Sequence, residues 1–172
     1  PRLRLERMFK DHHGLVWRML RRMGLSADQA SDLTQQAYLV AVERLPDIRA
    51  GSERAFLVGT ALRLAHSARR RARRMRLDDD MDVHPGRELH PERLGEDRAA
   101  IRLLDRVLAG LPPPLVTVFV LFELEGLSSP EIAQTLDIPG GTVASRLRRA
   151  RLAFRTRAAR LERSLSQEGH RR

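Results

Sequence analysis

Residues 137–151 read DIPGGTVASRLRRAR, and this stretch decides the fold of the second half of the chain. Its Pro-Gly-Gly triplet predicts a tight turn, because proline and glycine interrupt regular structure. Beyond the turn, Val143, Leu147 and Ala150 recur at spacings of three and four residues. This spacing predicts a helix that starts at Thr142 and buries one apolar stripe.

A second helix is expected immediately before the turn. Ser128 is followed three residues later by Glu131, which is the pattern of a capping box at a helix N-terminus. Ile132, Ala133 and Leu136 then supply its inward face. Two short helices joined by a tight turn form a helix-turn-helix, whose second helix enters the major groove of DNA.

The outward positions of the helix after the turn are candidate DNA contacts. They are Thr142, Ser145, Arg146, Arg148 and Arg149. Thr142 and the free N–H groups of the first turn suit a phosphate, since a helix N-terminus attracts anions. Spacing alone leaves a second interpretation open, because many helical hairpins with a glycine turn bind nothing and their arginines form a solvated face.

The composition indicates a globular and strongly basic chain. Its 172 residues carry a formal net charge of +10, with 42% hydrophobic and 31% charged residues. That length fits one mid-sized domain or two small ones. The absence of cysteine excludes disulfides and thiolate metal sites. Lys10 is the only lysine, and arginine is the residue that makes bidentate contacts to phosphate or guanine. A GC-rich genome also favours arginine, but it does not explain where the charge lies.

No segment is expected to enter a membrane. The most apolar stretch, LVTVFVLF at residues 115–122, is too short to span a bilayer. The N-terminus lacks the apolar region of a signal peptide. A cytoplasmic protein is therefore expected.

The charge divides the chain into three parts. Residues 1–77 carry a net charge of +10, residues 78–100 carry −5, and residues 101–172 carry +5. The middle part is polar, contains two prolines and two glycines, and has no sustained helical period. We therefore expect an all-α protein with two small helical domains, 1–77 and 101–172, joined by an acidic flexible linker, 78–100.

Three helices are expected in the first domain, since apolar residues recur at helical spacing in three segments. The expected inward faces are Phe9, His12, Val16, Leu20 and Met23, then Leu33, Ala37 and Val40, then Leu57, Ala61, Leu64, Ala65 and Ala68. Ser26 to Gln29 is expected to cap or turn into the second helix, and Pro46 to end it.

The third helix runs into an arginine-rich stretch, ARRRARRMR at residues 68–76. Such density is self-repulsive unless a polyanion binds, so the stretch is a candidate nucleic-acid surface. Its candidate contacts are Arg63, Arg69, Arg70, Arg71 and Arg73. A solvated face that pairs with the acidic linker is the alternative.

No catalytic or metal site is expected. His12 and His13 have no cysteine pair or carboxylate cluster near them in the sequence, and no nucleophile–base–acid arrangement, P-loop or dinucleotide motif occurs. Neither a cofactor nor an enzymatic activity is therefore predicted for this chain.

Several segments resemble, in order, bacterial RNA polymerase sigma factors of the extracytoplasmic-function (ECF) group. IPGGTVASRLRRAR, preceded by SSPEIAQTLD, is similar to the recognition helix-turn-helix of that family. FKDHHGLVWRMLRRMG, SDLTQQAYLVAVERL and ERAFLVGTALRLAHSARRR are similar to its first domain. The resemblance covers about residues 8–76 and 101–160, and two matches around a linker are more specific than one helix-turn-helix.

The resemblance implies a function for each part. The chain would bind core RNA polymerase and direct promoter-specific transcription initiation, under the control of an anti-sigma factor. Asp32, Gln35 and Gln36 would contact the polymerase clamp. The five arginine candidates of the third helix would meet and help melt the −10 element of promoter DNA. The helix-turn-helix would meet the −35 element, and the linker would thread through the polymerase.

Four positions depart from the family pattern. Gln36 replaces the usual glutamate, and Leu64 follows Arg63 where the family often has asparagine. Ala144 and Gly140 stand where longer side chains are common, so we expect phosphate anchoring and shape readout to outweigh base reading. Two other functions remain open: a sigma-like protein that titrates an anti-sigma factor, and a stand-alone helix-turn-helix regulator.

Overall fold

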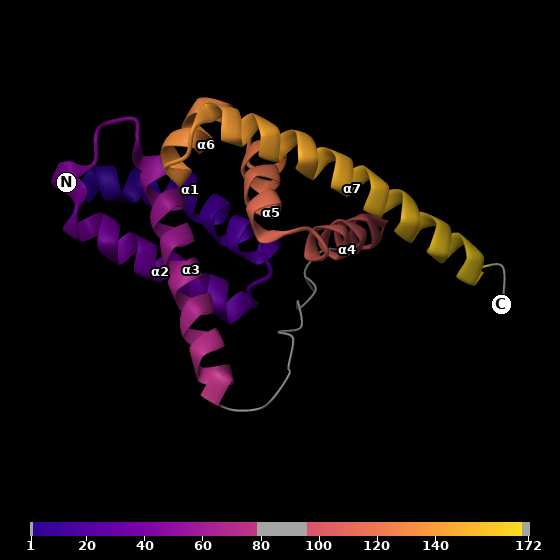
Figure 1. Cartoon of the computed structure of the whole chain (residues 1–172). Coiled ribbons are helices and arrows are strands. Elements are labelled where there is room, and N and C mark those ends of the chain that lie inside the picture. The colour runs from indigo at the N-terminus through magenta and orange to yellow at the C-terminus, as the bar shows by residue number, and fades with distance from the viewer. Residues whose placement is uncertain (1, 79–95, 170–172) are drawn as a thin grey trace. The chain divides into compact units, whose positions relative to one another are not determined.

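The computed structural model describes residues 2–78 and 96–169, and within these ranges the chain forms helices and no β-strand (Figure 1). The α-helices are α1 (Arg2–Arg22), α2 (Ala27–Glu43), α3 (Glu53–Asp78), α4 (Glu96–Ala109), α5 (Pro113–Phe119), α6 (Ser129–Leu136) and α7 (Gly140–Gly169). Contacts divide the chain into two units, one built chiefly from α1–α3 and the other chiefly from α4–α7. The all-α prediction is confirmed.

The core of the first unit begins with α1, whose inward face differs in one place from the prediction. Val16 and Leu20 are buried as expected, but Phe9 is 53% exposed and its neighbour Met8 is buried instead. The prediction was wrong because the spacing of three and four suits either residue, and only the packing partner distinguishes them. The ring of Phe9 lies instead against Tyr38, with 5.3 Å between ring centroids.

Helix α2 begins with the predicted cap. The Ser26 side chain accepts a hydrogen bond from the Gln29 amide, and the Gln29 side chain accepts one from the Ser26 amide. This reciprocal capping box satisfies two backbone donors that a helix start leaves free. The inward face consists of Ala30, Leu33, Thr34, Ala37 and Ala41. Its small side chains suit the close packing of α2 against α3.

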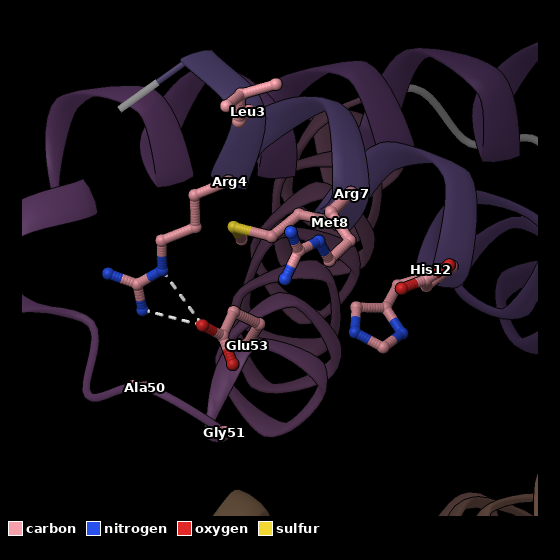
Figure 2. A pocket seen from close by; sticks show the side chains of 9 residues that line it. Leu3, Arg4, Arg7, Met8, His12, Ala50, Gly51 and Glu53 are labelled. Carbon is pink, nitrogen blue, oxygen red and sulfur yellow. Dashed lines mark hydrogen bonds and ion pairs between the residues drawn. The ribbon is translucent and has the colours of Figure 1, made fainter.

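A short connection joins α2 to α3, and the N-terminal end of α1 holds it in place. It contains a 3₁₀ turn at Leu45–Asp47, which the sequence analysis did not predict. The Arg4 guanidinium donates to the carbonyl oxygens of Leu45 at 3.2 Å and Ile48 at 2.6 Å. It also donates to Glu53 Oε1 at 2.9 Å (Figure 2). One arginine therefore ties α1, the connection and the start of α3 together.

Helix α3 is buried only along its first half. Leu57, Val58, Ala61, Leu62 and Ala65 form its inward face. The prediction was wrong for Ala68, which is exposed, because the packed part of the helix ends near Ala65. The arginine-rich half continues as helix to Asp78.

The second unit starts within the stretch that we expected to be linker, since α4 begins at Glu96. Residues 79–95 of that linker lie outside the described residues. Helix α5 is followed by a wider π-helical turn at Val120–Leu124. Val118, Val120 and Leu121 are fully buried in this segment.

Helices α6 and α7 form the predicted helix-turn-helix. Glu131 Oε2 accepts from the Ser128 amide at 2.8 Å, which confirms the expected capping box. The turn is closed by the Ile138 amide, which donates to the Ala133 carbonyl at 3.0 Å. Helix α7 begins at Gly140, two residues earlier than predicted. Its long inward face packs against α4 and α5.

Candidate nucleic-acid interface

Helix α7 is held to the second unit by the stripe that the sequence predicted. Val143, Leu147 and Ala150 are buried. One turn later, the ring of Phe154 stacks on that of Phe119 of α5, with 4.7 Å between centroids. This packing fixes the rotation of α7 and therefore decides which of its side chains face solvent.

The five recognition candidates of α7 divide into two groups. Ser145, Arg148 and Arg149 are exposed, whereas Thr142 and Arg146 are half-buried. The Ser145 hydroxyl donates to the Thr142 carbonyl at 3.0 Å, so its oxygen remains as an acceptor. The exposed group is the one that can reach DNA without a change in the packing of α7.

The N-terminus of α7 differs in detail from the sequence expectation. The amides of Thr142 and Val143 both donate to the Pro139 carbonyl, at 2.9 and 3.2 Å. The preceding amides, those of Gly140 and Gly141, lie at exposed positions ahead of these bonds. Open space surrounds both Cα atoms where a side chain would start. A phosphate would therefore meet the glycine amides rather than that of Thr142.

Arg151, the fourth arginine of the opening stretch, has a structural partner. Its Nε donates to Glu123 Oε1 at 2.6 Å, and its guanidinium lies 5.2 Å from the ring centroid of Phe122. The sequence could not show this pairing, because the partners are 28 residues apart. Arg151 therefore braces α7 against the π-helical turn.

The five arginine candidates of α3 do not form one group. Arg63, Arg70 and Arg71 are exposed, while Arg69 is half-buried and its pKa is lowered by burial. Spacings of seven and four place Arg63, Arg70 and Arg74 along one side of α3, so Arg74 joins the candidates. The Arg63 guanidinium also donates to Thr60 Oγ1 at 3.0 Å. Arg73 lies in the helix, and its side chain is outside the described part of the structure.

A histidine lies among these arginines. Burial, and then the positive charges of Arg69 and Arg70, lower the pKa of His66 below its ordinary value. His66 stands three residues after Arg63, but no sequence pattern marks it as a candidate.

The three polymerase-contact candidates lie on the outer face of α2. Asp32, Gln35 and Gln36 are all exposed. On the same side, Leu39 is 57% exposed and Val42 is 52% exposed. Both residues lie outside the helical spacing of the buried residues of α2. Their exposure could have been predicted from that spacing, but it was not.

Aromatic rings border this face of α2. The Tyr38 hydroxyl donates to the Met8 carbonyl at 3.0 Å, and burial, together with the Asp11 carboxylate, raises the pKa of Tyr38 to about 12. The rings of Phe9, His13 and Tyr38 form a cluster, with 4.5 Å between the centroids of Phe9 and His13 and 6.1 Å between those of His13 and Tyr38. The outer face of α2 therefore combines polar, aliphatic and aromatic groups.

A hollow of about 570 Å³ lies beside the N-terminal half of α1, between that helix and the start of α3 (Figure 2). Its lining includes Arg7, Asp11 and His12, together with the Arg4–Glu53 pair. Burial alone would raise the pKa of Glu53, but backbone hydrogen bonds and Arg4 outweigh it, so the pKa lies below its ordinary value. The hollow carries charges of both signs and has no metal-binding arrangement.

The described residues hold neither a metal-binding cluster nor a membrane-spanning helix. Within residues 2–78 and 96–169, no three histidine or carboxylate side chains gather in a way that could hold a metal ion. No helix in these ranges has the length and apolarity needed to cross a bilayer.

Comparison with known families matches both halves of the chain. Residues 8–75 match the family described as Sigma-70 region 2. Residues 101–154 match the family described as Sigma-70, region 4. The two matches occur in the same order as the two surfaces described above, the arginine-rich α3 and the helix-turn-helix.

Curated relatives carry related names. The chain is 29% identical over 153 residues to "ECF RNA polymerase sigma factor SigE" of Mycolicibacterium smegmatis, across 87% of this chain and 60% of that protein. It is 42% identical over 65 residues to "ECF RNA polymerase sigma-E factor" of Escherichia coli K12, across 38% of this chain and 34% of that protein. The chain thus spans three-fifths or less of the length of these relatives.

Solved structures share the fold. The sigma factor RpoE of Bartonella quintana, in complex with the anti-sigma factor NepR, matches with a TM-score of 0.72 at 24% identity, across 87% of this chain and 95% of that one. CnrH, in complex with the cytosolic domain of CnrY, matches with a TM-score of 0.68 at 20% identity, across 91% and 88%.

Proposed function

The chain belongs to the sigma-70 family, in its extracytoplasmic-function group, and from this membership we propose that it binds core RNA polymerase and directs promoter-specific transcription initiation. The observation that carries the proposal is the presence of regions 2 and 4 in order, each with an exposed arginine surface. Members of the family are initiation factors, so we propose that the polymerase performs the chemistry and that this chain is not an enzyme.

We assign polymerase docking to the outer face of α2, within a first domain of residues 1–77. Asp32, Gln35 and Gln36 offer polar groups there, and Leu39 and Val42 offer exposed apolar area. Partially polar surfaces with a few apolar anchors are typical of specific protein interfaces. Gln36 keeps a hydrogen-bonding group at the position where the family usually has a charge, so docking persists without a charge-assisted bond.

The −10 element is assigned to α3. Arg63, Arg70 and Arg71, with Arg74 beside them, form a positive surface that phosphates would neutralise. Arg69 contributes less because it is half-buried, and Arg73 follows from its position alone. A nearby phosphate would act on the pKa of His66 in the opposite direction to Arg69 and Arg70, because its charge is negative.

The −35 element is assigned to the helix-turn-helix, in a second domain of residues 101–172. Ser145, Arg148 and Arg149 would enter the major groove, and the amides of Gly140 and Gly141 would meet a phosphate. Thr142 and Arg146 stand at the edge of this surface. Ala144 presents only a methyl group, which supports phosphate and shape readout over base reading.

The remaining parts of the proposal concern the linker and regulation. We propose that residues 78–100 connect the two domains along the polymerase, where their negative charge suits a channel built for nucleic acid. One of the similar solved structures is a sigma factor in complex with an anti-sigma factor, and we propose a partner of that kind here. A cytoplasmic location follows from these partners.

A run-off transcription assay tests the proposal. The chain is combined with core polymerase and a promoter library, and transcripts above the level of core polymerase alone are expected. A matched variant, Glu6→Gln on exposed α1 surface, should leave the yield unchanged, whereas the Asp32→Ala, Gln35→Ala, Gln36→Ala triple variant should lower it.

Two outcomes would favour the other functions. Tight binding to an anti-sigma factor with no transcript from any promoter would indicate a titrating protein. Specific duplex binding by the chain alone, with no affinity for core polymerase, would indicate a stand-alone regulator.

A further inference from the structure

Helix α7 is longer than a helix-turn-helix requires. Its 30 residues correspond to about 45 Å of helix. The region 4 match ends at residue 154, yet the helix continues to Gly169 (Figure 1). On its inner side the extension still packs, because the Arg157 guanidinium occupies the space where a side chain at Gly110 would start. The extension is therefore packed against the second unit through its inner side, and its outer face is free of that packing.

That outer face is rich in arginine. Arg155, Arg160 and Arg163 are exposed on it; a spacing of seven residues places Arg155 in line with Arg148, a spacing of eleven places Arg160 in line with Arg149, and Arg163 lies between these two lines. The exposed Glu162 lies seven residues after Arg155, on the same side of the helix. None of the three arginines forms an ion pair with a carboxylate among the described residues. Arg160 and Arg163 lie three residues apart, and like charges at this spacing destabilise a helix unless an anion lies near them.

The arginine side chains leave their outer nitrogens available. Arg155 Nε donates to the Arg151 carbonyl at 3.5 Å, and Arg163 Nε donates to the Ala159 carbonyl at 3.1 Å. Each bond uses only the inner nitrogen, so the two Nη groups of each guanidinium remain as donors. Between the arginines the outer positions include Thr156 and Ala159, and the exposed Leu152 lies one turn before Thr156.

We propose that residues 155–163 of α7 form a phosphate-binding extension of the helix-turn-helix, which contacts the DNA backbone beside the segment that Ser145, Arg148 and Arg149 enter. The proposal rests on the function proposed above. Arg155 lies about 9 Å along the helix from Arg149, and the major groove is about 12 Å wide. A helix that enters the groove with its N-terminus therefore brings Arg155 to the phosphates at the groove edge. Arg160 and Arg163 lie five and eight residues further, which is about 7.5 and 12 Å along the helix from Arg155.

The salt dependence of promoter binding tests this extension. The binding constant K of holoenzyme assembled from the full chain is measured at several salt concentrations on promoters that give transcripts in the run-off assay. The triple variant Arg155→Gln, Arg160→Gln, Arg163→Gln is compared with wild type. Each lost phosphate contact should reduce the slope of log K against log salt by about 0.9, so a reduction of about 2–3 is expected. The preferred promoter sequence should not change, because phosphate contacts carry no direct sequence information.

Two matched variants accompany it. Lysine at the same three positions keeps the charge and should retain most of the slope. Glutamine at three exposed positions outside the extension removes the same charge; these positions are Arg44, Arg102 and Arg106. This control should change the slope by less than half as much as the variant of the extension does. Ethylation interference should then show phosphates outside the base-contacting segment that matter for wild type and not for the glutamine variant.

An unchanged slope, or one that changes equally in the control, would overturn the extension while leaving the proposed function intact. Weaker assembly with core polymerase at an unchanged salt slope of promoter binding would also overturn it. The three arginines would then bind an acidic protein surface. The absence of any specific promoter complex with wild type would instead refute the proposed function.

Discussion

At the scale of single residues, Arg4 has the most consequential contacts in the first unit. It lies 41 to 49 positions from its partners in sequence, and it reaches two carbonyl oxygens and one carboxylate. These groups belong to the connection between α2 and α3 and to the first turn of α3. Buried carbonyls that lose a donor are costly, so the connection depends on this one side chain.

Replacing Arg4 by Met should therefore destabilise the protein by about 1–3 kcal/mol, since three hydrogen bonds in a partly buried site are lost. Urea unfolding followed by circular dichroism measures the effect. The matched control is Arg2→Met, because Arg2 also pairs with a glutamate, at 3.0 Å, but on exposed surface. An exposed pair contributes about 0–1 kcal/mol, so the control should cost clearly less.

The same pair predicts a pH dependence. The pKa of Glu53 is lower in the folded chain than in the unfolded one, so its contribution to stability is present above its ordinary pKa of 4.5. The contribution is lost as the pH falls through the lowered folded value. Unfolding measured between pH 6 and pH 3 should show this loss in wild type and not in the Arg4→Met variant; parallel curves would contradict it.

At the scale of elements, the two capping boxes decide where α2 and α6 begin. Both place a serine before the helix and a Gln or Glu three residues later, and both form the reciprocal bonds. Helix α6 is only eight residues long, so it is marginal without its cap. The helix-turn-helix therefore depends on Ser128 more than its exposed position would indicate.

Ser128→Ala should destabilise the second unit by about 1 kcal/mol, because it removes a capping oxygen. Thermal unfolding of the full chain checks this value, with Ser145→Ala as the control. Ser145 is also exposed, but its hydroxyl only returns a bond to its own helix, so its loss should change stability by less than about 0.5 kcal/mol. Equal losses of stability from the two substitutions would show that the Ser128 cap stabilises the second unit no more than the Ser145 hydroxyl does.

At the scale of the whole molecule, the exposed apolar residues of α2 matter for assembly rather than for folding. More than half of the surface of Leu39 and of Val42 stays exposed in the folded chain, so a polar substitution should cost much less stability than one in the core. The double variant Leu39→Asp, Val42→Asp should nevertheless weaken binding to core polymerase by about tenfold or more, as expected for interface anchors. Titration of labelled polymerase measures the affinity.

The control for that experiment is Leu152→Asp, which changes a 64% exposed leucine on α7. It should leave polymerase affinity within about threefold of wild type, a difference of about 0.6 kcal/mol. If Leu152→Asp weakens binding as much as the α2 variant does, the α2 face is not the specific docking surface.

Much of this protein follows from local sequence patterns. Spacings of three and four residues predicted the helices, the two serine caps predicted where α2 and α6 begin, and the Pro-Gly-Gly turn predicted the helix-turn-helix. These features depend on residues within one or two turns of each other, so the chain needs no distant partner to specify them. The motifs of regions 2 and 4 are local in the same sense.

Only the tertiary structure decided which faces of the helices are exposed to solvent. Periodicity could not choose between Met8 and Phe9, because the choice depends on what α2 and α3 offer to α1. It could not show that Arg151 is held by Glu123 while Arg148 and Arg149 remain exposed, or that Arg4 reaches the connection before α3. These pairings join residues 28 to 49 positions apart, and only packing in three dimensions brings such groups within hydrogen-bonding distance.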